Sequence, residues 1–307
     1  MYQLKRIVVS VDLSDMDEEV IRYTSIIAEV MDADTIYFLH VAPSLDLPDN
    51  LTPEDHAALA PVDETIKHEV QTTIDQYFQQ RTDTDIDIDV MEGRPTEALL
   101  KYAKQKEADL IVLGKPGKKL RAKVNLGKIA ELSTCSALFV PKGADIQIKK
   151  IGVAVDFSEH AKLALEQALR IAQEGSDIEV YGFHVYRIPH GYSKTGKSYE
   201  EFAQIMKKNA EEDAHKFFKK YNSIDQEYCQ MLYELTQDKE IHDELNDLAT
   251  EKNVDMLLIG SQGRTAAASM LLGSVSEELL HYENKFPLFI VKNKDDNMGF
   301  FEALFKL

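Results

Sequence analysis

Short apolar runs and longer amphipathic stretches alternate along the chain. The apolar runs occupy residues 6–11, 36–41, 85–91, 109–113 and 137–140, and then 151–155, 178–185, 228–235, 255–259 and 287–291. Between them, stretches such as 63–80, 95–106 and 126–134 place apolar residues at helical spacing. Because strands that alternate with helices usually form a parallel sheet covered on both faces, the pattern predicts an α/β protein.

The pattern of the first half recurs in the second half. KRIVVSVDLSD at 5–15 matches KKIGVAVDFSE at 149–159, which puts Asp12 and Asp156 at an offset of 144 (156 − 12 = 144). EADLIVLGKPG at 107–117 matches NVDMLLIGSQG at 253–263, and ALFVPK at 137–142 matches PLFIVK at 287–292. Such ordered blocks at a near-constant offset indicate a duplication. The predicted domains are residues 1–145 and 146–293, followed by a tail at 294–307.

Each copy is predicted to be a doubly wound, five-stranded parallel-sheet domain. Ser14 is the expected N-cap of the helix after the first strand, because acidic residues follow it and suit the helix dipole. Sheets of this kind bind ligands beyond the carboxyl ends of their strands, beside the topological switch point. That rule points to the residues directly after a strand, which are Asp12, Asp156, Gly114 and Gly260.

A glycine pattern follows the fourth strand of the second copy. Gly260 and Gly263 are separated by two residues, and nine more precede Gly273 and Ser274. The glycines are expected to let the backbone approach a ligand in conformations that a side chain forbids. The amides and hydroxyls that open the helix after Gly273 suit a phosphate. The alternative is that the same residues form only a turn and a helix cap.

With this motif and the duplication, the chain resembles a tandem universal stress protein, with two UspA-type domains of the adenine nucleotide alpha hydrolase-like fold. The nucleotide-binding members of that family carry G-x2-G-x9-G-[S/T], which the second copy matches. The resemblance implies bound ATP, to which Mg2+ can be attached. It assigns Asp156, Ala154, Val155, Val185, Ile259 and Gly260 to the base and ribose, and Gln262, Gly263, Gly273, Ser274, Val275 and Ser276 to the phosphates.

The first copy departs from this motif. It keeps Asp12, Val41, Gly114, Gly117 and Gly127, but Lys128 replaces the hydroxyl residue and Pro116 removes an amide from the turn. The same stretch holds six cations: Lys115, Lys118, Lys119, Arg121, Lys123 and Lys128. Two interpretations remain open. Either this is a degenerate nucleotide site with a solvated loop, or the loop neutralises an anion, whether phosphate or an acidic partner.

Charge narrows the range of partners. The chain carries 53 acidic and 35 basic side chains, for a net charge of -18, so binding to nucleic acid or an anionic membrane is not expected. The first residues lack the pattern of a secretory signal, and no apolar run approaches the roughly 18–20 residues that a membrane helix needs. Two cysteines provide no disulfide framework, which favours a reducing compartment. A cytoplasmic location is therefore predicted.

The chemistry of a catalyst is missing from the sequence patterns. No Cys/His cluster has metal spacing, GxxxxGK[ST] and HxGH are absent, and the recurring His40 and His184 are interpreted as structural or as neighbours of the base. The favoured function is a nucleotide-responsive stress protein that is not an enzyme. The alternatives are a slow ATPase or phosphotransferase and a nucleotide-free scaffold. We also expect the two copies to pair through strands 137–141 and 287–291, a homodimer, and a protein partner of unknown identity.

Overall fold

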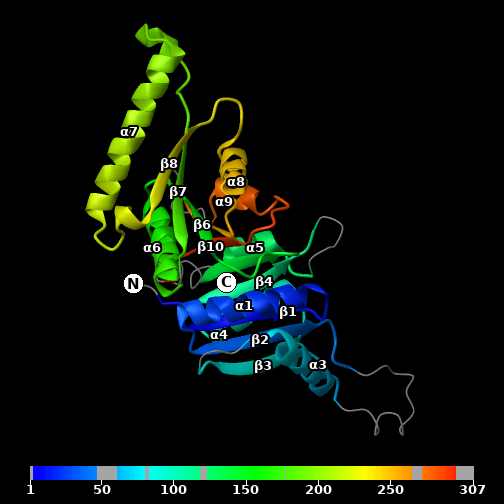
Figure 1. The fold of residues 1–307 in the computed structure, drawn as a ribbon. Coiled ribbons are helices and arrows are strands. Elements are labelled where there is room, and N and C mark those ends of the chain that lie inside the picture. Colours follow the sequence, from blue (N-terminus) through cyan, green and yellow to red (C-terminus); the bar gives the residue numbers. More distant parts are fainter. Residues whose placement is uncertain are drawn as a thin grey trace. The chain divides into compact units, whose positions relative to one another are not determined.

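The computed structural model describes residues 3–46, 61–79, 83–117, 123–175, 177–264 and 272–294. The chain divides into two compact units. Of the described residues, the second unit contains those from 147 to 293, and the first contains those from 3 to 146 together with Lys294. Each unit contains five parallel strands and its own helices (Figure 1).

The first unit alternates strands and helices as the apolar pattern predicts. Its strands are paired in the order β3-β2-β1-β4-β5, and all four pairings are parallel. The elements are β1 (Arg6–Val11), α1 (Met16–Met31), β2 (Thr35–Ala42), α3 (Val62–Tyr77), β3 (Asp85–Glu92), α4 (Pro95–Gln105), β4 (Leu110–Lys115), α5 (Leu126–Leu132) and β5 (Ser136–Pro141).

The second unit repeats this topology. Its strands are paired in the order β8-β7-β6-β9-β10, again all parallel. The elements are β6 (Lys150–Ala154), α6 (Glu159–Glu174), β7 (Glu179–Tyr186), η1 (Tyr192–Thr195), α7 (Tyr199–Lys220), η2 (Gln226–Tyr228), β8 (Gln230–Leu235), α8 (Ile241–Glu251), β9 (Met256–Gly260), α9 (Ser274–Leu279) and β10 (Leu288–Val291). The predicted fold class, two tandem doubly wound α/β domains, is confirmed.

The strand order reverses at the same point in each sheet. Strand β1 pairs with β2 on one side and with β4 on the other, and β6 likewise lies between β7 and β9. The crossover helices therefore leave in opposite directions from these central strands, and a crevice opens beyond their carboxyl ends. In the second unit, α6 packs on β6 and β9, while α8 packs on β7 and α9 (Figure 1).

Burial of the central strands explains their apolar sequences. Ile7, Val8 and Val9 of β1 are fully buried, and so are Leu257 and Leu258 of β9. Helices cover both faces of these strands, so neither face needs polar residues. Each such side chain contributes about 1.5–3 kcal/mol on leaving water. The edge strand β3 differs, because it alternates aspartate with apolar residues and its ends are exposed.

Unusual backbone conformations also recur in pairs. Among the described residues, six other than glycine have positive φ, and they match between the units at offsets of 144, 145 and 146 (157 − 13, 177 − 32 and 253 − 107). The pairs are Leu13 with Phe157, Asp32 with Asp177, and Glu107 with Asn253. Left-handed backbone is costly for side chains with a Cβ, so its recurrence at matching positions indicates that the fold itself imposes it.

The predicted N-cap of the first helix is wrong by one residue. Asp15 occupies the cap position of α1 without a side-chain cap bond, whereas Ser158 caps α6 by accepting from the amide of Ala161. In the first unit the carboxylate of Asp17 lies at this helix end and accepts from the amides of Asp12 and Leu13.

Candidate functional site

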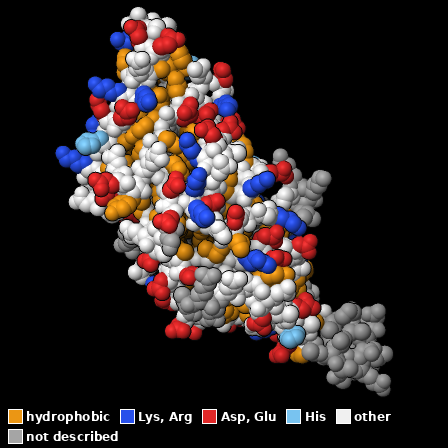
Figure 2. Space-filling view, viewed as in Figure 1, with side chains coloured by type: hydrophobic (Ala, Val, Ile, Leu, Met, Phe, Trp, Pro, Cys, Tyr) orange, Lys and Arg blue, Asp and Glu red, His pale blue; other side chains and the backbone are white. Residues whose placement is uncertain are grey.

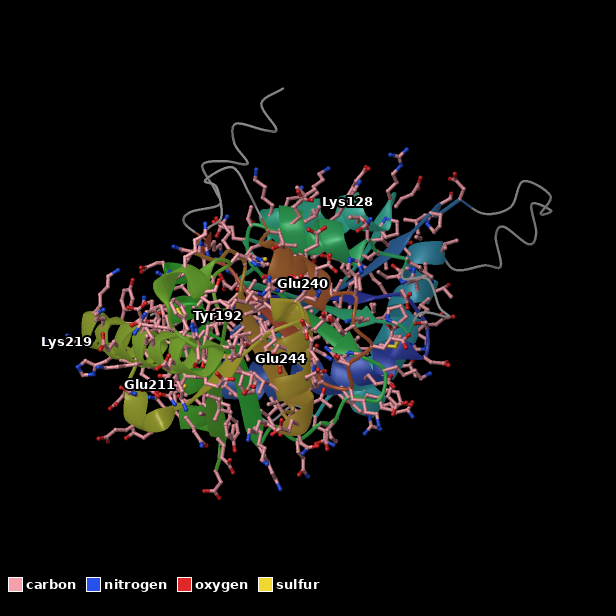
Figure 3. All side chains as sticks on the ribbon, turned by 90° about the horizontal axis from the view of Figure 1, so that it is seen from above. Lys128, Tyr192, Glu211, Lys219, Glu240 and Glu244 are labelled. Atoms are coloured by element: carbon pink, nitrogen blue, oxygen red, sulfur yellow. The ribbon has the colours of Figure 1, made fainter. Side chains whose placement is uncertain are left out.

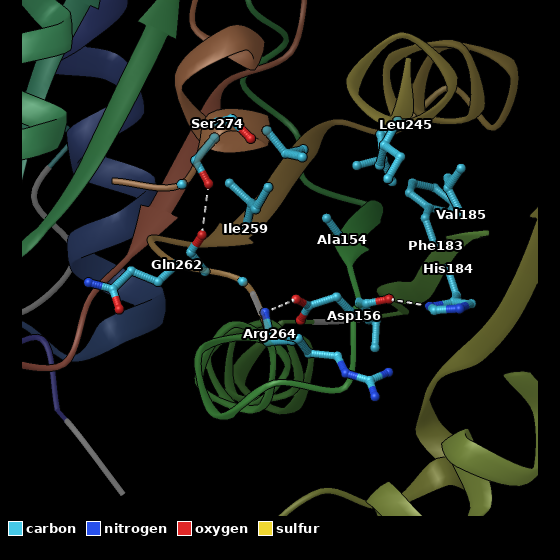
Figure 4. A pocket seen from close by; sticks show the side chains of 18 residues that line it. Ala154, Asp156, Phe183, His184, Val185, Leu245, Ile259, Gln262, Arg264 and Ser274 are labelled. Atoms are coloured by element: carbon cyan, nitrogen blue, oxygen red, sulfur yellow. Dashed lines mark hydrogen bonds between the residues drawn. The ribbon is translucent and has the colours of Figure 1, made fainter. Parts of the chain in front are cut away.

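A cavity of about 490 Å³ lies at the switch point of the second unit (Figure 4). It falls in the size range typical of small-molecule sites, about 300–1,000 Å³. All twelve residues that the sequence assigns to the nucleotide line it. These are Ala154, Val155, Asp156, Val185, Ile259, Gly260, Gln262, Gly263, Gly273, Ser274, Val275 and Ser276. Residues up to 122 positions apart (276 − 154 = 122) thus meet in one place, although their contacts with a ligand stay a prediction.

The inner part of this cavity is apolar. The apolar side chains come from the residue after β6 and from β7, α8 and β9, and they belong to Val155, Phe183, Ile241, Leu245 and Ile259. Figure 4 shows Leu245 and Val185 on one side of the cavity, with Ser274 and Gln262 at the other end. A planar aromatic base suits the first region and a polar group suits the second.

Gly260 and Gly263 are closely packed and do not have special backbone angles. Neither has a left-handed φ, so the expected backbone conformations are wrong, whereas a close approach to a ligand stays a prediction. A Cβ on Gly260 would lie 2.6 Å from the Cβ of His160 and 2.7 Å from its carbonyl carbon, so β9 touches the backbone of α6. A Cβ on Gly263 would lie 2.9 Å from Oδ2 of Asp156.

Asp156 holds the two loops of the site together. Its Oδ2 accepts from the amide of Arg264 at 2.7 Å (Figure 4), and its Oδ1 accepts from the amide of Ser158 at 3.0 Å. The carboxylate therefore joins the start of α6 to the loop after β9. The hydroxyl of Ser276 is also engaged, because it donates to the carbonyl of Gly260 at 2.9 Å. Ser276 therefore offers a phosphate its amide rather than its hydroxyl proton.

Backbone amides are concentrated at the polar end. Gly273 donates its own amide to the carbonyl of Ser261 at 2.7 Å, which ties the two glycine loops together. The next amides, of Ser274, Val275 and Ser276, open α9, and helix geometry leaves them without intrahelical acceptors. Together with the loop at Gly263, they can bind an oxyanion through the main chain.

The histidines at the strand ends are structural. Nδ1 of His184 lies 2.7 Å from the carbonyl oxygen of Val155, and Nδ1 of His40 lies 3.2 Å from that of Val11. Burial lowers the pKa of both imidazoles. Among the described residues no group of three His, Cys, Asp or Glu could hold a metal ion. Asp156 already accepts two amide bonds, so the residues present do not form a ligand set for Mg2+.

The first unit has a cavity of only about 240 Å³ at the matching place. Of the residues that the sequence assigns to this second site, Asp12 and Gly114 line it, whereas Val41, Gly117, Gly127 and Lys128 do not. Gly117 and Lys128 are exposed, and Figure 3 shows Lys128 on α5. The structure thus does not gather the residues proposed for a phosphate here.

Side chains of the first unit occupy the space that the second unit leaves open. Nζ of Lys123 donates to the carbonyl of Asp12 at 2.7 Å and lies 3.9 Å from Oδ2 of the same residue. Asp17 lines the small cavity, where the second unit has Ala161. Burial raises the pKa of Asp17 to about 6. The acid pair and the lysine together make this cavity unsuitable for an anion.

The start of the matching helix also differs in the first unit, because one of its amides already has a hydrogen-bond partner. Helix α5 begins at Leu126, which matches Leu272, whereas α9 begins only at Ser274. The side chain of Asn125 accepts from the amide of Lys128 at 2.9 Å, and Lys128 matches Ser274. The amide that matches that of Ser274 therefore already has a partner in the first unit. Lys118, Lys119 and Arg121 of the predicted basic loop lie outside the described residues.

Sequence reasoning missed several residues of the site. Phe157 does not line the cavity itself, but it has a φ of 64° and stacks on the lining residue His184, with ring centroids 4.4 Å apart. Ile241 and Leu245 line the cavity from α8, and Arg264 lines it from the loop after β9. The recurrence of Asp-Leu and Asp-Phe after the first strand of each copy was an available signal for Phe157. The apolar face of α8 resembles any core-facing helix, so it carried no signal for a cavity.

The surface contains charges of both signs. On the face shown in Figure 2, acidic and basic side chains are interspersed without a continuous basic area. No helix in the described part of the chain has the length and apolarity to cross a membrane.

Several features expected from the sequence stay predictions, namely pairing of the two copies, a homodimer, a protein partner and a cytoplasmic location. The apolar residues of the predicted tail from 295 onward lie outside the described residues.

The fold and both glycine loops can now be compared with known proteins. The model of the universal stress protein family matches residues 3–140 and again residues 147–292. The chain therefore belongs to the universal stress protein family, with two copies of its domain, as predicted. Universal stress protein MJ0577 of Methanocaldococcus jannaschii is 29% identical over 167 residues, which cover 49% of this chain and 98% of that protein.

Solved structures resemble this chain to different extents. A universal stress protein from Archaeoglobus fulgidus aligns over 95% of this chain and 99% of its own, with a TM-score of 0.62 and 19% identity. At that identity the likeness shows the fold alone. Another solved universal stress protein, in complex with cAMP, covers 46% of this chain and 98% of its own, with 21% identity and a TM-score of 0.33.

Proposed function

We propose that the second unit binds an adenine nucleotide and that the chain acts as a nucleotide-responsive stress protein. One observation carries the proposal: the twelve residues that the sequence assigns to the nucleotide line a single cavity of about 490 Å³ at the switch point of the sheet. The cavity combines an apolar inner part with main-chain amides at its other end. That division matches the two halves of a nucleotide, a planar base and an anionic phosphate.

The bound nucleotide would lie along the cavity. The adenine contacts Val155, Val185 and Ile259, with Leu245 and Ile241 closing the apolar side. The ribose lies beside Asp156 and Gly260, and the phosphate end meets the loop at Gly263 and the amides that follow Gly273. ATP, with Mg2+ attached to its phosphates, is the ligand that the motif predicts.

The first unit would not bind a nucleotide in this way. Its cavity is about half as large, and Lys123 lies on the backbone and carboxylate of Asp12 within it. The amide of Lys128 is bonded to Asn125. These contacts favour the interpretation of a degenerate site over that of an anion-binding loop.

We propose binding rather than efficient catalysis. Asp156 is the one carboxylate among the described lining residues, and its oxygens accept from the amides of Arg264 and Ser158. A general base must instead accept a proton from water or from an acceptor group. The chain is therefore expected to keep ATP intact over the time of a binding measurement, and steady release of ADP from purified protein would contradict this.

The test is nucleotide binding by paired variants of the full chain. Gly273→Val places a branched side chain in the loop near the expected phosphate, and its backbone angles (φ −76°, ψ 148°) suit valine. Gly127→Val is the matched control, because Gly127 occupies the same position in the first unit. Isothermal titration with adenine nucleotides should show the dissociation constant raised about tenfold or more by Gly273→Val and unchanged by Gly127→Val. Equal affinity of all three proteins would refute the proposed site.

A further inference from the structure

The outermost strand and helix of the second unit border an unpaired edge. Strand β8 pairs with β7, and its other edge pairs with no strand in the described part of the chain. Helix α7 packs on these same two strands. One flank of α7 faces the centre of the unit, because Oδ2 of Asp213 lies 4.0 Å from Nη1 of Arg264 in the loop after β9. Nζ of Lys220 likewise lies 4.0 Å from Oε2 of Glu159 on α6.

Charged residues line the opposite flank of α7. Helical spacing puts Glu200, Lys207 and Glu211 within about 40° of one another around the helix axis. Lys207 acts electrostatically on Glu234 of β8. Glu211 acts in the same way on Tyr233 of that strand. This charged flank therefore lies on the side of α7 that borders β8 and its free edge.

Four charged side chains of α7 have no ion pair with another described residue. They are Glu200, Lys207, Glu211 and Lys219, and Figure 3 labels the last two. The helix dipole favours an acid in the first turn and a base in the last turn, but its effect does not extend to the middle of the helix. There a lysine precedes a glutamate by four residues, which is the less favourable order within a single helix. Pairing within α7 therefore does not account for the pattern.

The charges of α7 are complementary to those of a second α7 that runs antiparallel to it. With the symmetry axis between Asn209 and Ala210, each residue faces the one whose number brings the sum to 419. Every charged residue of α7 then faces an opposite charge or a neutral residue. The facing pairs of opposite charge, all exposed and each occurring twice, are Glu200 with Lys219, Lys207 with Glu212, and Lys208 with Glu211. A helix whose charges complement themselves suits a second copy of the same chain.

The geometry of the sheet allows the two helices to meet. Neighbouring strands lie about 4.8 Å apart, and α7 packs over β7 and β8. If the free edges of β8 and of its copy meet antiparallel, the two α7 helices also run antiparallel and lie about two strand spacings, or about 10 Å, apart. Packed helices lie about 8–10 Å apart. The edge also lacks the charges that usually prevent such contacts, because Glu234 is the one charged residue of β8.

The matching surface of the first unit lacks this complementarity. The edge strand β3 has four acidic residues among its eight, and α3 has four acidic residues and one lysine. Antiparallel pairing of two α3 helices about their middle would place Glu64 opposite Asp75. Helix α7 instead has five acidic and five basic residues, in a chain with a net charge of -18. The outer helix of the second unit is therefore self-complementary, whereas that of the first unit repels its copy.

We propose that two chains form a symmetric dimer through α7 and the edge of β8 of their second units. Strands β8 and β10 are at opposite ends of the strand order in this unit, so the dimer leaves the predicted pairing of strands 137–141 and 287–291 undisturbed. The ion pairs are exposed, so each is weak and is screened by salt. The dissociation constant of the dimer should therefore rise about tenfold or more between about 50 mM and 500 mM NaCl.

The first test is sedimentation equilibrium of the full chain at low salt. Lys208→Glu places like charges at both contacts with Glu211, and Glu211→Lys does the same with Lys208, so each variant should raise the dissociation constant about tenfold or more. Glu64→Lys on α3 changes the net charge as much as Glu211→Lys does and should leave the constant unchanged. A wild-type chain that stays monomeric up to about 500 µM, or variants that dimerise as tightly as the wild type, would overturn the proposal.

Mixing the two variants separates the contact from any effect on folding. In a mixed dimer, the chain with Lys208→Glu meets the chain with Glu211→Lys at one contact, and native Glu211 and Lys208 still face each other at the other. All facing pairs thus regain opposite signs, whereas the contact of Lys208 with Glu212 inside its own helix, at 3.9 Å, stays lost. The equimolar mixture should dimerise within about threefold of the wild type. A mixture that associates no more tightly than the separate variants would contradict the proposed pairing.

Discussion

Gly260 is the position where a single methyl group should damage the second unit most. A Cβ there would lie 2.6 Å from the Cβ of His160 and 2.7 Å from both its carbonyl carbon and oxygen. Ordinary contacts between carbon atoms begin at about 3.5 Å, so β9 and α6 must separate by roughly 1 Å or distort. Two of the three close atoms belong to helix backbone, which cannot rotate away.

The loss of stability expected for Gly260→Ala follows from the cost of overpacking a core. Forcing an extra methyl group into a packed core costs about 1–3 kcal/mol, which offsets the small gain from replacing glycine in a strand. For a unit of this size, Gly260→Ala should lower the melting temperature by roughly 2–12 °C. Gly114→Ala is the matched control in the first unit. There the closest atom is Cε of Met16 at 3.2 Å, a flexible side-chain end, and we expect a cost below about 1 kcal/mol.

The assay is differential scanning calorimetry of the full chain, with hydrogen exchange to localise the change. Gly260→Ala should speed exchange in β9 and α6 and leave β1 and β4 unaffected. Gly273→Ala adds a second comparison, because its Cβ would meet nothing closer than 3.5 Å and should change stability by less than about 0.5 kcal/mol. If Gly260→Ala is as stable as Gly114→Ala or Gly273→Ala, the close approach of β9 to α6 is not what requires this glycine.

Three further outcomes can be measured. Burial raises the pKa of Asp17 to about 6 in the folded state, above its value of 3.8 in the unfolded chain. As the pH falls from 7 to 5, the folded state therefore binds a proton that the unfolded chain does not, and the free energy of unfolding of the first unit should rise by about 1 kcal/mol. Urea unfolding should show this gain in the wild type and lose it in Asp17→Asn, and equal pH profiles would contradict it. Leu13 has a φ of 57° and is 41% exposed, so Leu13→Gly should be about 1 kcal/mol more stable than Leu13→Ala, whereas the reverse order would show that no strain is stored there. Cys135 and Cys229 are buried, and burial raises the pKa of Cys229 to about 12, so neither should react with a thiol reagent at pH 8 until urea unfolds the chain; rapid labelling of native protein would disprove this.

Much of the fold could be predicted because its signals are local. Residues 6–11 and 36–41 are apolar runs, and they form β1 at Arg6–Val11 and β2 at Thr35–Ala42. The offset between the copies placed Asp156 and Gly260 at the ends of matching strands, and both line the cavity, although Gly260 is the last residue of β9 rather than the first residue after it. The special backbone conformation expected of Gly260 was wrong, because the contact that requires a glycine is with His160, which is 100 residues away in sequence and is brought near only by packing.

The sequence by itself determined that this protein consists of two α/β copies and which copy keeps the complete glycine motif. Strand and helix periods, the repeat and the motif all depend on residues close together in the chain. Only the tertiary structure decided which cavity is open. Nζ of Lys123 donates to the carbonyl of Asp12, which is 111 positions away in sequence. Asp17 lies where the other copy has Ala161, and the side chain of Asn125 accepts from the amide of Lys128, which matches an amide at the start of α9. Sequence patterns report which face of an element is apolar, whereas the space left for a ligand depends on where side chains from distant elements end.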